Sequence, residues 1–372
     1  MNALAQVTIT AKVRICPDDD TQRLLLDTMH AYNSARNEVA EYICATHILS
    51  KAQLSKDLYR QLRANWGLGA QMAQSAIRTT VAKYKGILKN EGKWIQPTFK
   101  KPVYELVWNR DYSFSKGLFS LGTVKGRIKV GFFAAGVEKY LQSPARYGTA
   151  TLLTRHGKWY LHVPVTLEVP DVPNSSISNV VGVDLGINFH AVSFDSAGKV
   201  AFYHGRQAKR KRAHYQQLRK QLQHRQTPSA RRRMRAIGQR ENRWMRDVNH
   251  CVSKALVESQ PQGTLIVLED LTGIRSVTEK VRLYDRYTQV SWAFYDLRCK
   301  LEYKAALHGS KVIIVPPQYT SQTCPCCGHI EAKNRNKQKH RFVCRQCGYR
   351  SNDDRVAAMN LQRKGIEYLA SA

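Results

Sequence analysis

Three acidic residues that lie far apart in the sequence stand where a carboxylate could bind a metal ion. Asp184 ends the apolar stretch VVGVD, Glu269 ends TLIVLE, and Asp354 opens the helical pattern DRVAAMNLQRK. A single mixed sheet could bring two strand ends and one helix start together. Converging carboxylates are what two Mg²⁺ or Mn²⁺ ions require when they sit about 4 Å apart and hydrolyse a phosphodiester. The pattern therefore predicts catalytic and metal-binding roles for all three residues.

Each of these carboxylates also has a purely structural explanation. An Asp after a buried strand often caps a turn, and Glu269 could be an exposed strand end. A carboxylate in the first turn of a helix is favoured by the helix dipole. Asp353 is a rival to Asp354 for either role. The three positions alone leave both explanations open.

Five of the nine cysteines crowd into residues 324–347. Two Cys-x-x-Cys pairs are separated by sixteen residues, which is the spacing of a zinc ribbon. Four thiolates in a tetrahedron form a closed structural site. The spacing predicts one structural Zn²⁺ held by Cys324, Cys327, Cys344 and Cys347.

Other residues near the cysteine pairs bear on this prediction. Gly328 and Gly348 follow the pairs, where a metal-binding turn needs backbone freedom. Cys326 is an extra thiol that could replace a neighbour, and His329 and His340 are possible ligands that nothing requires. A redox role for the adjacent cysteines is the alternative, but it leaves the second pair without a purpose.

The charge indicates a polyanionic partner. Lys and Arg number 59 against 28 acidic residues, a net charge of +31 that is spread along the chain. Such self-repulsion favours nucleic acid as the partner over a membrane surface, which would suit a single basic tail. No apolar run is long enough for a membrane span, and the N-terminus lacks a signal-peptide pattern. We expect a cytoplasmic protein with no membrane partner.

One segment concentrates this charge. Residues 206–246 hold fifteen Lys or Arg and a single acid, Glu241. Apolar residues recur at helical steps on either side of Pro228, which predicts two basic helices within 206–257. A face of one sign suits a phosphate backbone, and Arg suits bidentate phosphate contacts. The predicted nucleic-acid contacts are Arg210, Arg212, Arg219, Arg231, Arg232, Arg233 and Arg235.

The remaining elements suggest how these residues are positioned. A strand at 2–15 is followed by a helical pattern at about 21–91, and then by short β-rich runs up to Val169 that suggest a small barrel or curled sheet. The first strand could pair into that sheet. After a Pro- and Ser-rich linker, buried strands alternate with helices, which indicates an α/β core.

With these motifs identified, the chain resembles the TnpB family of transposon-encoded nucleases, which are related to type V CRISPR effectors. GVDLGINFHAV resembles the first RuvC motif and IVLEDLTGI the second, which places the catalytic carboxylates at Asp184 and Glu269. The segment from YTSQTCPCCGH to NDDRVAAMNL resembles the zinc ribbon and the third motif, which places the last carboxylate at Asp354. Val356 stands where the family has Asn, and Cys326 is also a departure, but neither removes a carboxylate.

The resemblance implies a multidomain α/β architecture. It comprises an RNase H-like RuvC core with an inserted zinc ribbon, and an N-terminal wedge barrel with an inserted helical recognition block. The implied segments are the wedge at 1–15 and 93–170, the recognition block at 16–92, a linker at 171–179, the RuvC core at 180–318, the ribbon at 319–350 and the RuvC C-terminal helix at 351–372.

The resemblance also implies an activity. A guide RNA would pair with one strand of double-stranded target DNA beside a short adjacent motif, and the RuvC site would cut the DNA. Alternatives are a compact CRISPR effector, a guide-dependent repressor without cleavage, and a transposase. Whether the chain is a monomer or a homodimer stays open.

Overall fold

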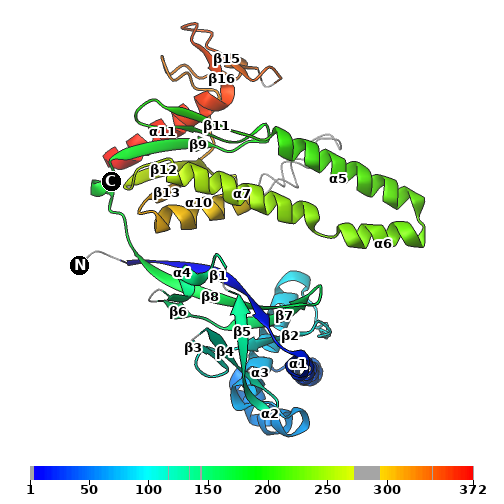
Figure 1. The fold of residues 1–372 in the computed structure, drawn as a ribbon. Helices are drawn as coiled ribbons and strands as arrows, with labels where there is room; N and C mark the ends of the chain where they lie inside the picture. Colours follow the sequence, from blue (N-terminus) through cyan, green and yellow to red (C-terminus); the bar gives the residue numbers. More distant parts are fainter. Residues whose placement is uncertain are drawn as a thin grey trace. The chain divides into compact units, whose positions relative to one another are not determined.

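The computed structural model describes residues 4–115, 117–133, 135–142, 145–271, 294–336 and 338–371. The chain divides into two compact units (Figure 1). One comprises Gln6–Glu168, and the other comprises Met1–Ala5 with Val169–Ala372. The helices expected between the second and third core strands are described only from Phe294 onward, and the end of the IVLEDLTGI motif lies outside the described residues.

The first unit is built on an eight-stranded sheet that curls into a nearly closed barrel. Its order is β2-β7-β8-β1-β5-β4-β3, with β6 paired to β8, so the N-terminal strand lies inside the sheet as predicted. A short helix α4 (Glu138–Gln142) precedes β6. The strands are β1 (Leu4–Cys16), β2 (Val103–Leu106), β3 (Tyr112–Ser115), β4 (Leu118–Thr123), β5 (Gly126–Phe133), β6 (Arg146–Tyr147), β7 (Ala150–Arg155) and β8 (Lys158–Pro170).

Three helices are inserted between β1 and β2: α1 (Asp19–Thr46), α2 (Lys51–Trp66) and α3 (Ala70–Glu91). Asp18 caps the first helix by accepting a bond from the Thr21 amide. The helices share one hydrophobic core with the sheet, in which Tyr32 and Tyr104 pack with ring centroids 6.2 Å apart. The helical segment is therefore packed on the sheet through a common core and has no separate one.

The second unit contains a five-stranded sheet in the order β11-β10-β9-β12-β13. Strands β9, β12 and β13 are parallel. Strand β10 pairs antiparallel with β9, and β11 pairs antiparallel with β10. A 3-10 turn, η1 (Asn174–Ser176), precedes this sheet. The strands are β9 (Asn179–Asp184), β10 (Phe189–Phe194), β11 (Val200–His204), β12 (Thr264–Glu269) and β13 (Lys311–Val315).

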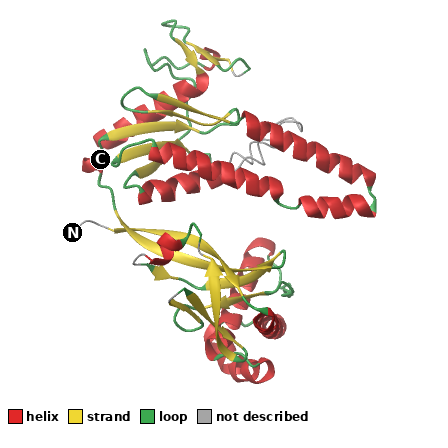
Figure 2. Ribbon diagram, in the orientation of Figure 1, coloured by secondary structure: helices red, strands yellow, loops and turns green. Residues whose placement is uncertain are grey.

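Helices cover both faces of this sheet (Figure 2). Helices α7 (Arg240–Glu258) and α10 (Phe294–Leu307) pack on one face, and α11 (Asp353–Ser371) packs on the other. Each central strand is buried on both sides, which explains its unbroken apolar sequence. The predicted α/β core is confirmed in this coarse form.

A basic helical arm extends from the sheet between β11 and β12 (Figure 1). It consists of α5 (Arg206–Arg225), α6 (Pro228–Ile237) and the first part of α7. Pro228 starts α6 as predicted, but a second break at Gly238, with φ 47°, divides the expected second helix in two. Leu222, Ala230 and Ile237 form a small core of their own in this arm.

The cysteine segment forms a small module between β13 and α11. It holds a turn η3 (Ala332–Asn334) and three short antiparallel strands, β14 (Arg335–Asn336), β15 (Arg341–Val343) and β16 (Arg350–Asn352). The last strand leads directly into α11, so the module and the helix start are joined without a linker.

Candidate metal and nucleic-acid site

Asp184 and Glu269 end neighbouring parallel strands on the same face of the sheet. Leu268 of β12 pairs with Val183 of β9. Glu269 and Asp184 are the next residues on the two strands, so they lie at adjacent positions. Adjacent strands lie about 4.8 Å apart. Because side chains alternate along a strand, the two carboxylates share the face on which Val180 and Val267 pack against α11.

Two glycines let α11 approach this face closely. A Cβ on Gly182 would lie 2.0 Å from the Ala358 carbonyl oxygen and 2.3 Å from the Gln362 amide nitrogen. A Cβ on Gly365 would lie 2.4 Å from Val267. The helix backbone thus rests on the backbone of β9, two residues before Asp184. Neither glycine was predicted from the sequence, although Gly182 lies inside a strand, where a glycine often marks close backbone approach.

The same packing brings Asp354 to the strand ends. Asn352 caps α11 by accepting bonds from the amides of Asp354 and Arg355 at 3.0 and 3.1 Å. Asp353 and Asp354 are buried in the first turn of the helix. Asp354 therefore lies near Asp184 and Glu269 at one end of the sheet, with Asp353 beside it. Among the described residues at this end, the group whose donor atoms lie within 4.8 Å of one another is His340, Asp353 and Asp354, and it includes neither strand-end carboxylate.

The electrostatics of this acidic pocket (Asp184, Glu269, Asp353 and Asp354) show that its negative charge is not fully balanced. Burial raises the pKa of Asp184 well above its usual range, and the charges of Asp354 and Glu269 raise it further. Burial also raises the pKa of Glu269 and of Asp354, with Asp353 adding to the latter shift. Buried carboxylates that repel one another are a donor set that divalent cations stabilise.

Side chains of the cysteine module reach into this pocket. Arg335 Nε lies 2.7 Å from Asp353 Oδ2, and its Nη2 lies 3.6 Å from Asp354 Oδ1. Nδ1 of His340 lies 3.4 Å from Asp353, and the donor atoms of His340, Asp353 and Asp354 lie within 4.8 Å of one another. Thr320 Oγ1 donates to Glu269 Oε1 at 3.2 Å. The sequence patterns gave no reason to assign Arg335 or Thr320 to this site.

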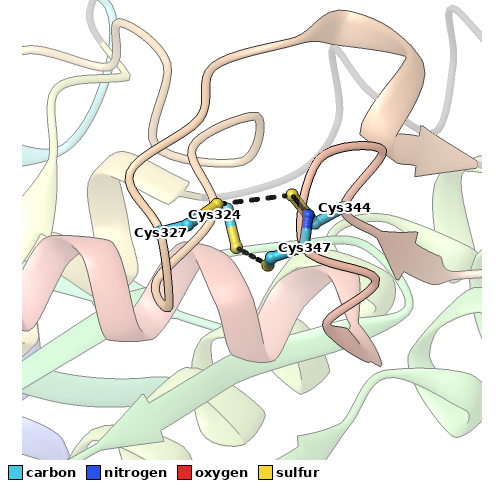
Figure 3. Close-up of side chains that lie close together, drawn as sticks. All are labelled: Cys324, Cys327, Cys344 and Cys347. Carbon is cyan, nitrogen blue, oxygen red and sulfur yellow. Dashed lines mark hydrogen bonds between the residues drawn. The ribbon is translucent and has the colours of Figure 1, made fainter.

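The four predicted cysteines form a compact cluster (Figure 3). The sulfurs of Cys324 and Cys347 lie 3.6 Å apart, as do those of Cys327 and Cys344. A tetrahedral zinc site with Zn–S bonds of about 2.3 Å requires sulfurs about 3.8 Å apart, so the cluster fits the ion. Cys326 is exposed and lies outside this group of four.

The turns around the cysteines repeat one geometry. Gly328 and Gly348 have φ of 76° and 72°, and each donates its amide to the carbonyl of the first cysteine of its pair at 3.0 Å. Neither His329 nor His340 belongs to the sulfur cluster: His329 lies 3.3 Å from Glu331. Val356, the departure in the third motif, is buried with Cys324 and Cys344, so it fills the core of the module.

The seven arginines proposed as nucleic-acid contacts differ in their surroundings. Arg212 is buried and lies 4.0 Å from the buried Glu241, and Arg219 pairs with the same carboxylate at 2.6 Å. These two hold α5 against α7. The other five are exposed on α5 and α6: Arg210, Arg231, Arg232, Arg233 and Arg235.

Two family models match the chain. Residues 162–272 match a model described as a probable transposase, and residues 294–361 match one described as a Cas12f1-like TNB domain. These segments together contain all three predicted carboxylates and all four cysteines. No described helix is both long and apolar enough to cross a membrane.

Several curated relatives match as well. The chain is 34% identical over 235 residues to a CRISPR-associated endodeoxyribonuclease Cas12f1 of Sulfoacidibacillus thermotolerans, covering 57% of this chain and 52% of the relative. It is 30% identical to a putative RNA-guided DNA endonuclease InsQ of Escherichia coli K12, covering 58% of this chain and 56% of the relative. A TnpB-like protein of Methanocaldococcus jannaschii is 35% identical over 126 residues, which cover 34% of this chain and 44% of the relative.

The fold has a solved counterpart. The protein is similar to a chain in the structure of a Cas12f1–guide RNA–target DNA complex, with a TM-score of 0.56 and 13% sequence identity. The match covers 96% of this chain and 99% of the chain in the complex. At this identity the match concerns the fold alone. The fold and the acidic pocket define a class of mixed α/β proteins with a four-cysteine module. The matches confirm the resemblance to the TnpB family and its Cas12f relatives, although the chain spans only about half the length of several curated relatives.

Proposed function

We propose that this protein is an RNA-guided DNA endonuclease of a transposable element, which hydrolyses DNA phosphodiesters at the acidic pocket. The observation that supports the proposal is the packing of α11 on Gly182, because it brings the helix start that carries Asp354 near Asp184 and Glu269. A guide-dependent repressor would not need this unbalanced cluster of buried carboxylates.

The donor set fits two divalent cations, Mg²⁺ or Mn²⁺. Asp184, Glu269 and Asp354 would hold them, since each supplies hard oxygen ligands and each has a pKa raised by burial. Bound ions would supply an activated water and neutralise charge on the leaving oxygen. Thr320 would orient Glu269, and Arg335 would hold Asp353 and Asp354 in place.

The strand order supports the finer assignment of an RNase H-like RuvC core. In this proposal Val169–Ala372 is the nuclease unit, interrupted by a structural zinc ribbon with one Zn²⁺ on the four cysteines. The sheet of Gln6–Glu168 is the wedge barrel, and α1 to α3 form its recognition block.

The partners follow from charge and from the relatives. The net charge of +31 and the five exposed arginines of the arm suit the phosphates of a guide RNA and of double-stranded target DNA. We limit the proposed phosphate contacts to these five, because Arg212 and Arg219 neutralise Glu241.

A direct experiment tests this function. The protein is purified with its bound RNA, the RNA is sequenced, and DNA matching the RNA is offered with Mg²⁺. We expect cleavage by the natural chain and a loss of about 100-fold or more in Asp184→Asn. Either the absence of copurifying RNA or matched DNA left uncut by the natural chain would refute the proposal.

A compact CRISPR effector is the second candidate, and the match of residues 294–361 to a Cas12f1-like domain favours it. The same sequencing separates the two. An RNA derived from a repeat array indicates the effector, whereas an RNA from the end of a mobile element indicates the transposon nuclease.

A further inference from the structure

Tyr319 has a backbone conformation that its residue type does not favour. Its φ is 60°, in the left-handed region. Side chains there are uncommon, and the exceptions are mostly Asn, Asp and His. Among the described residues, the other non-glycine positions with positive φ are three His, one Asn and one Gln. A strained aromatic residue persists only where its surroundings impose the conformation.

Helix α11 imposes it from both sides. Lys364 Nζ donates to the carbonyls of Pro316 and Gln318 at 2.8 and 3.2 Å, just before Tyr319. Asn360 Nδ2 donates to the carbonyls of Thr320 and Thr323 at 2.7 and 2.8 Å, just after it. The helix that carries Asp354 therefore also fixes the segment 316–323.

The backbone carbonyl of Tyr319 accepts hydrogen bonds, whereas its side chain makes none that is described. The carbonyl accepts bonds from the amides of Gln322 and Thr323, both at 3.0 Å. The residue is 58% exposed, and within the described parts of the chain its ring and hydroxyl make no hydrogen bond or ring–ring contact. The bonds from Lys364 and Asn360 thus fix the backbone of a residue whose aromatic ring is largely exposed to solvent.

The location of this ring connects it to the acidic pocket. Tyr319 directly precedes Thr320, whose hydroxyl donates to Glu269. Lys364 provides a positive charge at the same segment, through its bonds to the carbonyls of Pro316 and Gln318. An exposed ring on a fixed backbone, one residue from a side chain that contacts Glu269 and with a cation on the same segment, suits a single-stranded polynucleotide. Its bases stack on aromatic rings and its phosphates attract cations.

We propose that Tyr319 is a positioning residue on which a base of the DNA strand stacks as its phosphate enters the acidic pocket. The inference rests on the proposed nuclease function and deepens it. Stacking is sequence-tolerant because every base presents a flat face, which suits a site whose target is chosen elsewhere by pairing. The ring would reduce the motion of the strand relative to Glu269.

The test combines variants with modified DNA. The full chain with its RNA is made as Tyr319→Gly, Tyr319→Phe and, as control, Tyr295→Ala, which removes another exposed Tyr (71%) of the same unit. Guide-matched substrates carry one abasic site at successive positions around the cut. Because Gly accepts positive φ, we expect Tyr319→Gly to melt at or above the natural temperature.

The expected result is a loss of about 10-fold in cleavage by Tyr319→Gly, about 1.4 kcal/mol, with the loss restored in Tyr319→Phe and absent in Tyr295→Ala. In the natural chain, an abasic site at one position of the DNA should reduce cleavage by the same factor. In Tyr319→Gly, the same abasic site should not reduce cleavage any further. Full cleavage by Tyr319→Gly, or the same abasic profile in both proteins, would overturn the inference.

A binding measurement separates this inference from the nuclease proposal. In an Asp184→Asn background, the affinity for a short fluorescent single-stranded DNA is measured by anisotropy with and without Tyr319→Gly. A drop of about 10-fold supports stacking even if matched DNA is never cut. Equal affinity, combined with full cleavage by Tyr319→Gly, removes the role of Tyr319 and leaves the nuclease function standing.

Discussion

The acidic pocket and the basic arm contribute opposite charges to the same unit, and they are encoded in opposite ways. The pocket draws its carboxylates from the ends of β9 and β12 and the start of α11, positions up to 170 residues apart. The arm gathers its arginines within one continuous stretch. Arginines along one continuous segment can still contact phosphates if the helices shift slightly. Carboxylates from separate elements must keep their relative positions to share a metal ion. The comparison predicts that single changes damage the pocket far more than the arm.

The largest effect is expected from Asp184→Asn. Losing a metal ligand removes several kcal/mol of transition-state stabilisation, so cleavage should fall by about 100- to 1000-fold or more. Stability should stay equal or rise in the metal-free protein, because the change removes a buried charge repelled by Asp354 and Glu269. Cleavage rates and thermal melting check both parts. A lower melting temperature with cleavage retained would make Asp184 a structural residue.

The next effect concerns the cysteine module that supports the pocket. Cys347→Ser should abolish zinc binding and, through the loss of the Arg335 and His340 contacts, reduce cleavage. Cys326→Ser is the matched control, since that thiol lies outside the cluster, and it should retain one Zn²⁺ per chain. Elemental analysis and melting curves measure the outcome. Equal zinc content in the two variants would contradict the four-cysteine site.

A smaller effect is expected from Gly182→Ala. The added Cβ would overlap the backbone of α11, at a cost of about 1–3 kcal/mol and with a displacement of Asp354. Gly131→Ala, in β5 with no atom within 4 Å of the added carbon, is the matched strand glycine and should be neutral for cleavage. Denaturant unfolding and cleavage are measured for both. Equal behaviour of the two variants would mean that close helix approach does not set the pocket.

The smallest effect is expected in the arm. Arg231→Gln should weaken nucleic-acid binding slightly and lower the slope of log affinity against log salt by about 0.9, as for one lost phosphate contact. Arg219→Gln should instead lower stability, because it leaves the buried Glu241 with less compensation. Salt titrations and melting curves distinguish them. A reversal of the two effects would show that exposure does not identify the phosphate contacts.

Local sequence determined much of this protein. The β-rich runs predicted up to Val169 form strands, Pro228 starts a helix, and the cysteine spacing forms a four-sulfur cluster. These features depend on alternation, on the missing amide of proline and on short-range spacing, which a sequence displays directly. The break at Gly238 was missed because a helical periodicity continued across it.

Tertiary structure decided the rest. Which arginines face solvent depended on Glu241, a single acid whose burial no periodicity reveals. Only the packing of α11 against Gly182 brings Arg335 and Thr320 to the carboxylates and imposes the left-handed conformation of Tyr319. Contacts between residues distant in sequence depend on how closely two backbones approach in three dimensions. In the sequence, the sign of this approach is Gly182, whose role cannot be recognised without the structure.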